Sequence, residues 1–227
     1  MSVDVRDEAG TFIAKWRGRW PEWELAMVFV PAAQRPLVEA WYTLLQEFTD
    51  AAWTGDPTPG LAKLAWWQDE LGGWAKGARR HPLGALLQAH PAPWLQLGRA
   101  LPDLRALRDD AGGDAPVAPA ATAGAHAGEA FAAAVADCEA VLFRNGTRGA
   151  GDAAAIRDSL FDERALLHAL SMDPIGAVDR PPSASRPGTR PRGIHAALVA
   201  ARLARPGAPV PPLRALFAAW RGARASG

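Results

Sequence analysis

The hydrophobic positions of this chain recur at helical spacing, most clearly in two neighbouring stretches. Residues 32–53 carry one apolar stripe, made of Leu37, Trp41, Leu44, Leu45, Phe48 and Ala52. Residues 58–78 carry another, made of Leu64, Trp67, Leu71, Trp74, Ala75 and Ala78. Both patterns predict helices, and at about 100° per residue Trp66 lies roughly a quarter-turn from the second stripe, beside Lys63 and Glu70. Because a surface helix buries a single stripe, the adjacent indoles predict that helix 58–78 is central to a bundle and covered on both sides.

The rest of the pattern predicts a single helical domain over residues 1–227. Further helices are expected at 83–89, 94–108, 194–204 and 213–224, from Phe131 to Leu142 and from Asp152 to Leu170. Near the start, Trp16, Trp20 and Trp23 fall near one helical face, although Pro21 must interrupt or begin a helix. Residues 1–10 are predicted to be a flexible tail. Residues 110–127 and the proline-rich segment 179–193 are predicted to be loops or linkers.

Composition narrows the class of protein. Four isoleucines and eleven valines against fifty alanines disfavour a large sheet and predict an all-α fold. The formal net charge of +1 gives no electrostatic case for nucleic acid or an anionic membrane as a partner. No window approaches 18 uninterrupted apolar residues, about the length a membrane span needs, which still leaves peripheral membrane contact open. The single cysteine, Cys138, excludes an internal disulfide, and we expect a cytoplasmic protein without a signal peptide.

Short motifs follow one another in this order along the chain: Phe29-Val30-Pro31, Arg35, Trp41-Tyr42, Leu44 to Glu47, Leu61, Lys63-Leu64, Trp66-Trp67, Gly77 and His81-Pro82. This succession resembles the N-terminal half of squalene/phytoene synthase-like proteins. The resemblance covers about residues 25–90, and the C-terminal half matches only in outline. It implies an isoprenoid-synthase-like helical bundle with a central apolar cavity. The bundle would take a prenyl diphosphate or another isoprenoid lipid.

Active members of that family carry two acidic motifs on facing helices, which hold Mg²⁺ for a diphosphate leaving group. The first motif would fall on Glu47 and Asp50, which are spaced to share a metal. No residues match the second, and Lys63 stands where the family usually has arginine. Tyr42, Lys63, Trp66, Trp67 and Glu70 are the cavity or substrate candidates that the resemblance implies. Ordinary core packing for the tryptophans, and a solvated helix shoulder for the two acids, remain alternatives.

Three functions are therefore open. The favoured hypothesis is a degenerate, non-catalytic relative that binds an isoprenoid or other lipid, or serves as an assembly factor, because the second acidic motif is missing. The alternative is an active Mg²⁺-dependent transferase that condenses prenyl diphosphates head to head. The third is a helical protein-interaction adaptor without a cavity.

Overall fold

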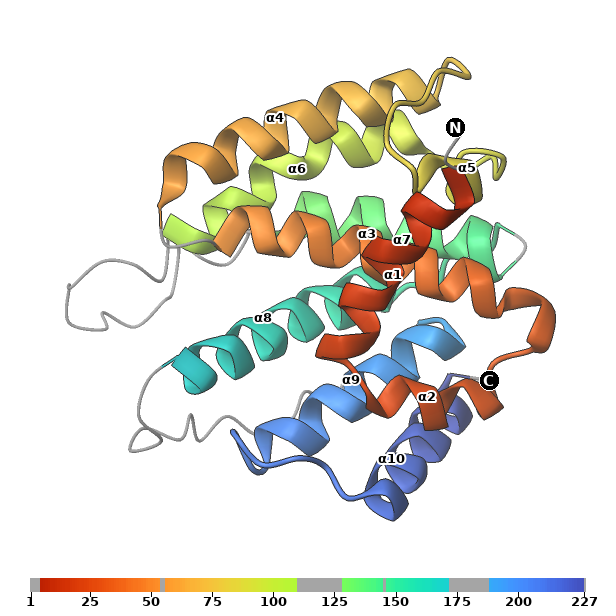
Figure 1. The fold of residues 1–227 in the computed structure, drawn as a ribbon, viewed down its shortest axis with the longest axis vertical. Coiled ribbons are helices and arrows are strands. Elements are labelled where there is room, and N and C mark those ends of the chain that lie inside the picture. The colour runs from red at the N-terminus through yellow and green to blue at the C-terminus, as the bar shows by residue number, and fades with distance from the viewer. Residues whose placement is uncertain (1–4, 54–55, 110–127, 145, 172–187, 227) are drawn as a thin grey trace.

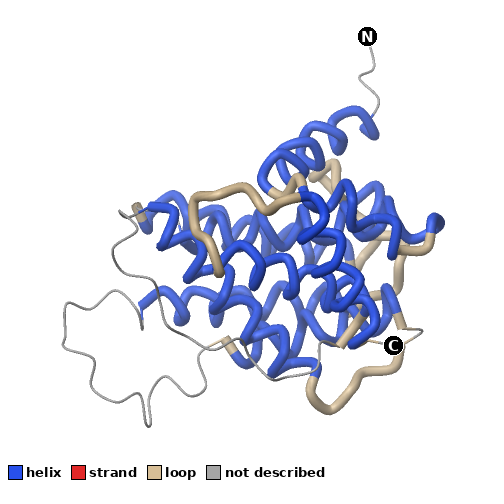
Figure 2. Tube along the Cα trace, turned by 90° about the horizontal axis from the view of Figure 1, so that it is seen from below, coloured by secondary structure: helices blue, strands red, loops and turns tan. Residues whose placement is uncertain are grey.

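The structure is a computed structural model, and it describes residues 5–53, 56–109, 128–144, 146–171 and 188–226. Within these ranges all regular structure is helical, which confirms the all-α prediction (Figures 1 and 2). The helices are α1 (Val5–Arg19), α2 (Glu22–Ala26), α3 (Arg35–Trp53), α4 (Pro57–Trp74), α5 (Gly84–Leu87), α6 (Trp94–Asp109), α7 (Glu129–Phe143), α8 (Asp152–Ser171), α9 (Arg190–Leu203) and α10 (Pro212–Ala225). Two 3₁₀ turns, η1 (Met27–Phe29) and η2 (Ala32–Gln34), connect α2 to α3. No helix in the described part is long and apolar enough to cross a bilayer.

Helix α3 is the centre of the bundle. It lies between the α4–α6 pair on one side and α8 and α9 on the other, and α1 crosses it (Figure 1). Trp41, Leu44 and Phe48 are fully buried, as their apolar stripe predicts. The polar residues on its other faces are buried too, including Gln46 and Glu47. A helix buried all round is normally apolar all round, so the polar faces of α3 need partners from neighbouring helices.

The prediction that helix 58–78 is central is wrong. Helix α4 packs against α6 and α3 at one edge of the molecule, and its opposite face is open to solvent, including Lys63 and Asp69. Trp67 is buried, but Trp66 keeps 37% of its surface exposed. Trp66 needs no second layer of helices, because Arg80 covers part of its ring. The Arg80 guanidinium carbon lies 5.4 Å from the ring centre.

Two predicted boundaries also need correction. Residues 5–10, expected in the flexible tail, belong to α1, and Ala9 is buried. Residues 190–193, expected in a loop, begin α9. The Thr189 hydroxyl accepts a hydrogen bond from the Arg192 N–H at 3.3 Å, and Pro191 occupies the first turn, where its missing N–H does no harm. Residues 110–127 and 179–187, which were also predicted to be loops, lie outside the described residues.

Candidate functional site

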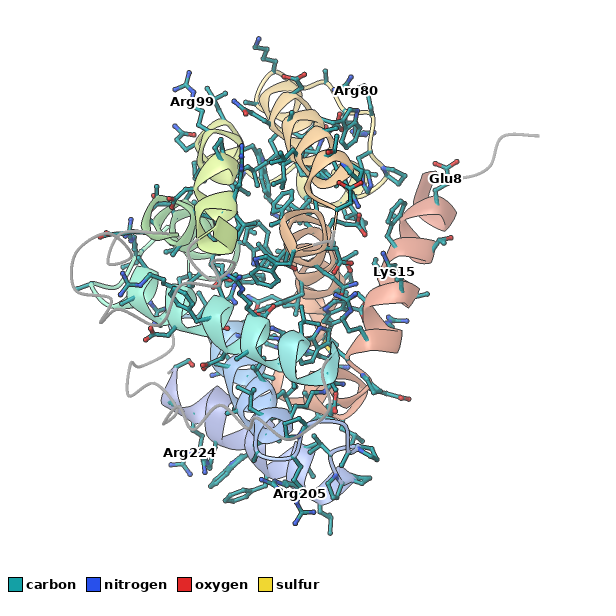
Figure 3. All side chains as sticks on the ribbon, turned by 90° about the vertical axis from the view of Figure 1, so that its left-hand side faces the viewer. Glu8, Lys15, Arg80, Arg99, Arg205 and Arg224 are labelled. Atoms are coloured by element: carbon teal, nitrogen blue, oxygen red, sulfur yellow. The ribbon has the colours of Figure 1, made fainter. Side chains whose placement is uncertain are left out.

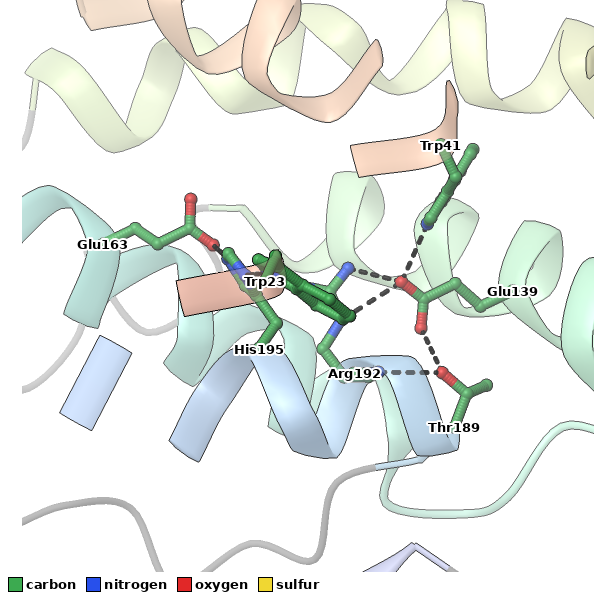
Figure 4. Close-up of polar contacts among 7 residues, drawn as sticks. All are labelled: Trp23, Trp41, Glu139, Glu163, Thr189, Arg192 and His195. Carbon is green, nitrogen blue, oxygen red and sulfur yellow. Dashed lines mark hydrogen bonds and ion pairs between the residues drawn. The ribbon is translucent and has the colours of Figure 1, made fainter. Parts of the chain in front are cut away.

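A buried ion pair joins α7 to α9 on the inner side of α3 (Figure 4). Arg192 and Glu139 are each only 1% exposed, and the guanidinium contacts Glu139 Oε1 through Nη2 and, at 3.1 Å, through Nε. Trp41 donates to the same oxygen at 3.0 Å, and the Thr189 hydroxyl donates to the other at 3.0 Å. Burial disfavours the charged guanidinium, but Glu139, together with Tyr42 and Glu163, outweighs burial and raises the pKa of Arg192 above its ordinary value. Arg192 therefore stays charged, and both oxygens of Glu139 accept hydrogen bonds.

A second polar group surrounds His195, one turn further along α9. Its Nε2 lies 2.7 Å from Glu163 Oε1 on α8, and its Nδ1 accepts a hydrogen bond from Trp23 Nε1 at 3.3 Å. Because Nδ1 accepts, the tautomer that satisfies both contacts carries its proton on Nε2 and donates it to Glu163. The rings of Trp20 and Tyr42 lie 4.8 and 4.7 Å from the imidazole, centre to centre. The imidazole is thus surrounded by aromatic rings, and its Nε2 contacts the Glu163 carboxylate.

The space at the centre of the bundle is small. The cavity beside His195 has a volume of about 50 Å³ and is walled by residues of α1, α3, α7, α8 and α9. Two buried polar atoms of α3 in its wall, Tyr42 Oη and Gln46 Oε1, have no hydrogen-bond partner among the described residues. Burial raises the pKa of Tyr42 well above its usual value, against the opposing effect of Arg192. A water needs roughly 10–15 Å³ by this measure, whereas ligand pockets usually reach about 300 Å³ or more, so the cavity fits a few waters only.

A larger groove opens next to this cavity. It has a volume of about 710 Å³ and runs between the α1–α2 corner, α8, the α9–α10 loop and the start of α10. Leu166, Leu170, Arg19 and Arg202 line both the groove and the central cavity, so the two adjoin. Leu25 and Leu170 are 39% and 51% exposed there. The volume of this groove lies within the usual range for a lipid or drug-sized ligand.

The predicted metal ligands, Glu47 and Asp50, lie on another face of α3 and contact cations. Lys63 Nζ lies 2.6 Å from Glu47, and Lys15 Nζ lies 3.7 Å from Glu47 and 3.6 Å from Asp50. Arg19 contacts both oxygens of Asp50, at 2.5 and 3.3 Å. Neither acid lines the central cavity or the groove. Three cations already neutralise these two carboxylates, so the donor set as it stands does not fit Mg²⁺.

Acidic residues from 46–56 and 137–163 do not face each other across the central cavity. Of these residues only Glu163 lines it. Asp137 pairs with Arg148 at 2.8 Å on the surface, and Asp152 pairs with Arg144 at 3.1 Å. The described residues contain no group of three His, Cys, Asp or Glu side chains that could hold a metal ion.

The other candidates of the 61–82 stretch hold the end of α4 in place. Trp67 packs on Phe48 and His81, with ring centres 5.3 and 4.5 Å away. Glu70 is 1% exposed and accepts hydrogen bonds from Trp74 Nε1 (2.8 Å) and from the backbone N–H groups of Arg80 (2.7 Å) and His81 (2.8 Å). Burial raises the pKa of Glu70, but these donors outweigh it and the net pKa is lowered. Trp66, Trp67, Glu70 and Lys63 therefore lie away from the central cavity, and Tyr42 alone of the candidates lines it.

Sequence reasoning missed Glu139, Glu163, Arg192 and His195. Glu139 had a usable signal, because it falls on the buried side of the apolar helix Glu129–Phe143, where a charged residue requires a partner. That partner lies 53 residues later, next to a proline in what looked like a loop. Nothing in the local pattern connects the two.

Comparison of the chain with family models, with curated proteins and with solved structures finds no match. These comparisons therefore assign no family. The features of the structure that bear on function are the two polar groups, the small central cavity and the adjoining groove.

Proposed function

We propose that this chain is a non-catalytic bundle of the isoprenoid-synthase type, related to the squalene/phytoene synthase-like proteins, which binds an isoprenoid or similar lipid in the groove beside α10. The proposal rests on one contrast. The cavity beside His195 has a volume of about 50 Å³, whereas the groove next to it has a volume of about 710 Å³.

The filled centre supports the loss of diphosphate chemistry. Two prenyl chains would need several times the volume of the central cavity. The space is occupied by aromatic rings and by the Glu139–Arg192 pair, which cannot be pulled apart without leaving a buried charge alone. The acids at 47 and 50 are held by lysine and arginine side chains. Both features are those of a bundle in which structural ion pairs replace a metal–phosphate centre.

The walls of the groove support an amphipathic ligand with an anionic head. Leu25, Leu166 and Leu170 supply apolar surface, and Arg19, Arg202 and Arg205 supply positive charge. Arg19 pairs with Asp50 and Arg202 with Glu22, whereas the Arg205 guanidinium makes no ion pair with a described residue. Arg205 is therefore the cation we assign to the ligand head.

Calorimetric titration with farnesyl diphosphate and with farnesol tests this proposal. We expect both to bind, and we expect Leu25→Gln to weaken both by about tenfold, since burying a leucine side chain contributes roughly 1.5–3 kcal/mol. Leu95→Gln on α6 is the matched control, because Leu95 is 37% exposed against 39% for Leu25 and lies away from the groove. Arg205→Gln should weaken farnesyl diphosphate binding more than farnesol binding.

Two results would overturn the proposal. Pyrophosphate release from farnesyl diphosphate in the presence of Mg²⁺ by the pure protein would restore the active transferase. Equal binding of the ligands by the Leu25 and Leu95 variants would remove the groove as the site, and no binding at all would favour an adaptor without a ligand.

A further inference from the structure

Helix α10 turns its large apolar side chains away from the bundle. The residues it buries are all small: Ala215, Ala219, Gly222 and Ala223. Its large apolar residues are exposed, with Leu213 at 82%, Phe217 at 57%, Trp220 at 39% and Leu216 at 37%. At 100° per residue these four side chains fall within about a third of the helix circumference. The Phe217 and Trp220 rings pack on each other, 5.5 Å between centres, so the outer face carries a continuous apolar stripe.

Packing within the chain does not require this stripe. The small inner residues let α10 lie very close to α9, and a Cβ on Gly222 would overlap the Gly193 carbonyl oxygen. The close approach to α9 is therefore made by the small face. An exposed cluster of this size, on a helix already anchored by its opposite face, indicates a contact with something outside the chain.

The charged side chains of α10 itself all have one sign. All 24 acidic residues of the chain precede Arg180, whereas nine of the 25 basic residues follow from that position on. Helix α10 contains Arg214, Arg221 and Arg224, all exposed, and no acid. On α2, which packs against α10, Glu22 is already paired with Arg202, which leaves Glu24 as the acid exposed there. Figure 3 shows Arg205 and Arg224 at the same end of the molecule, opposite Arg80 and Arg99.

We propose that α10 docks the protein on an anionic lipid surface. Leu213, Phe217 and Trp220 enter the boundary between head groups and acyl chains, and the arginines contact the lipid phosphates. A helix with aromatic and leucine side chains on one face and arginines beside them, and with no acid, is the pattern of an interfacial helix. A protein partner could also cover an apolar stripe, but the one-signed charge specifically matches a negative membrane surface. This inference does not depend on the groove, although Pro212 lines the groove one residue before the stripe begins.

Vesicle flotation with the full chain tests the inference. The probes are vesicles of phosphatidylcholine alone and of phosphatidylcholine with phosphatidylglycerol. We expect the protein to float with the anionic vesicles and much less with the neutral ones. Phe217→Ser combined with Trp220→Ser should lower the partition coefficient between anionic vesicles and water by about tenfold, because two aromatic anchors are lost. The Tm of this variant should fall by a few degrees at most, since Phe217 and Trp220 are 57% and 39% exposed and neither is a core residue.

Single-charge variants measure the electrostatic contribution to vesicle binding. Arg221→Gln should lower binding to anionic vesicles about fivefold, whereas Arg99→Gln, at the opposite end of the molecule, should leave it unchanged. Equal binding to both kinds of vesicle, or equal effects of the two arginine variants, would overturn the inference of an anionic surface. If the protein binds no vesicles, or if it self-associates and the Phe217/Trp220 variant does not, the inference of membrane docking is wrong and the stripe is a protein contact.

Discussion

Replacing Glu139 by glutamine removes one charge of the buried pair while keeping the shape of the side chain. Arginine stays protonated in folded proteins, so Arg192, which is 1% exposed, keeps its charge and loses its ion-pair partner. Leaving one member of a buried pair unpaired destabilises a protein by about 3–5 kcal/mol. In a chain of 227 residues this corresponds to a fall in Tm of roughly 6–20 °C.

Urea and thermal unfolding followed by circular dichroism measure this loss. Asp137→Asn is the matched control, because Asp137 lies two residues earlier on α7 and pairs with Arg148 on the surface, where the side chains are 45% and 39% exposed. That change should alter stability by about 1 kcal/mol or less. The double replacement Glu139→Leu with Arg192→Met should recover most of the loss, because it removes both charges together. A Glu139→Gln variant no less stable than the Asp137→Asn control would refute the claim that the pair is desolvated.

Three further predictions concern separate parts of the fold. Because the pKa of Glu70 is lowered by folding, its contribution to stability is fully present above the unfolded pKa of about 4.3 and is lost as the pH falls from there through the lower folded pKa. Glu70→Gln should therefore give a lower Tm at pH 7 and a flatter decline below about pH 5 in a pH series of melts. Gly222→Ala should destabilise the protein by about 1–3 kcal/mol in urea unfolding, because the new methyl group overlaps the Gly193 carbonyl, whereas Gly18→Ala, with open space around it, should be neutral or slightly stabilising. Tyr42→Phe should change Tm by only a few degrees, because the buried hydroxyl has no partner among the described residues; a loss above about 2 kcal/mol would contradict that description.

Helical periodicity located most elements because it is a local property of the chain. The stripe of Leu37, Trp41 and Phe48 does face the core, and the helix predicted at 58–78 is present as α4. The same periodicity placed helix 58–78 at the centre wrongly. A wheel gives the direction of each side chain but not what lies opposite it, and Trp66 turned out to face solvent and Arg80.

For the candidate site, too, the local pattern predicted some features and missed those that depend on packing. Tyr42 was identified from the sequence and lines the central cavity, but Glu47, Asp50 and Lys63 contact one another's charges or those of α1. Spacing can show that two acids share a helix face. The cations that neutralise them come from two other helices, Lys15 and Arg19 from α1 and Lys63 from α4. Whether a carboxylate is free for a ligand therefore depends on packing.

The sequence by itself determined an all-α chain, most of its helix positions and a stripe of tryptophans, because helix formation and amphipathicity follow from residues within one or two turns of each other. Only the tertiary structure decided that α3 is the central helix, that Glu139 meets Arg192, that the centre is filled while a groove remains beside it, and that α10 points Phe217 and Trp220 outward. Each of these joins or separates residues distant in the chain. Such pairings are fixed by which surfaces fit together and which buried charges can be neutralised, and neither can be read from a local pattern.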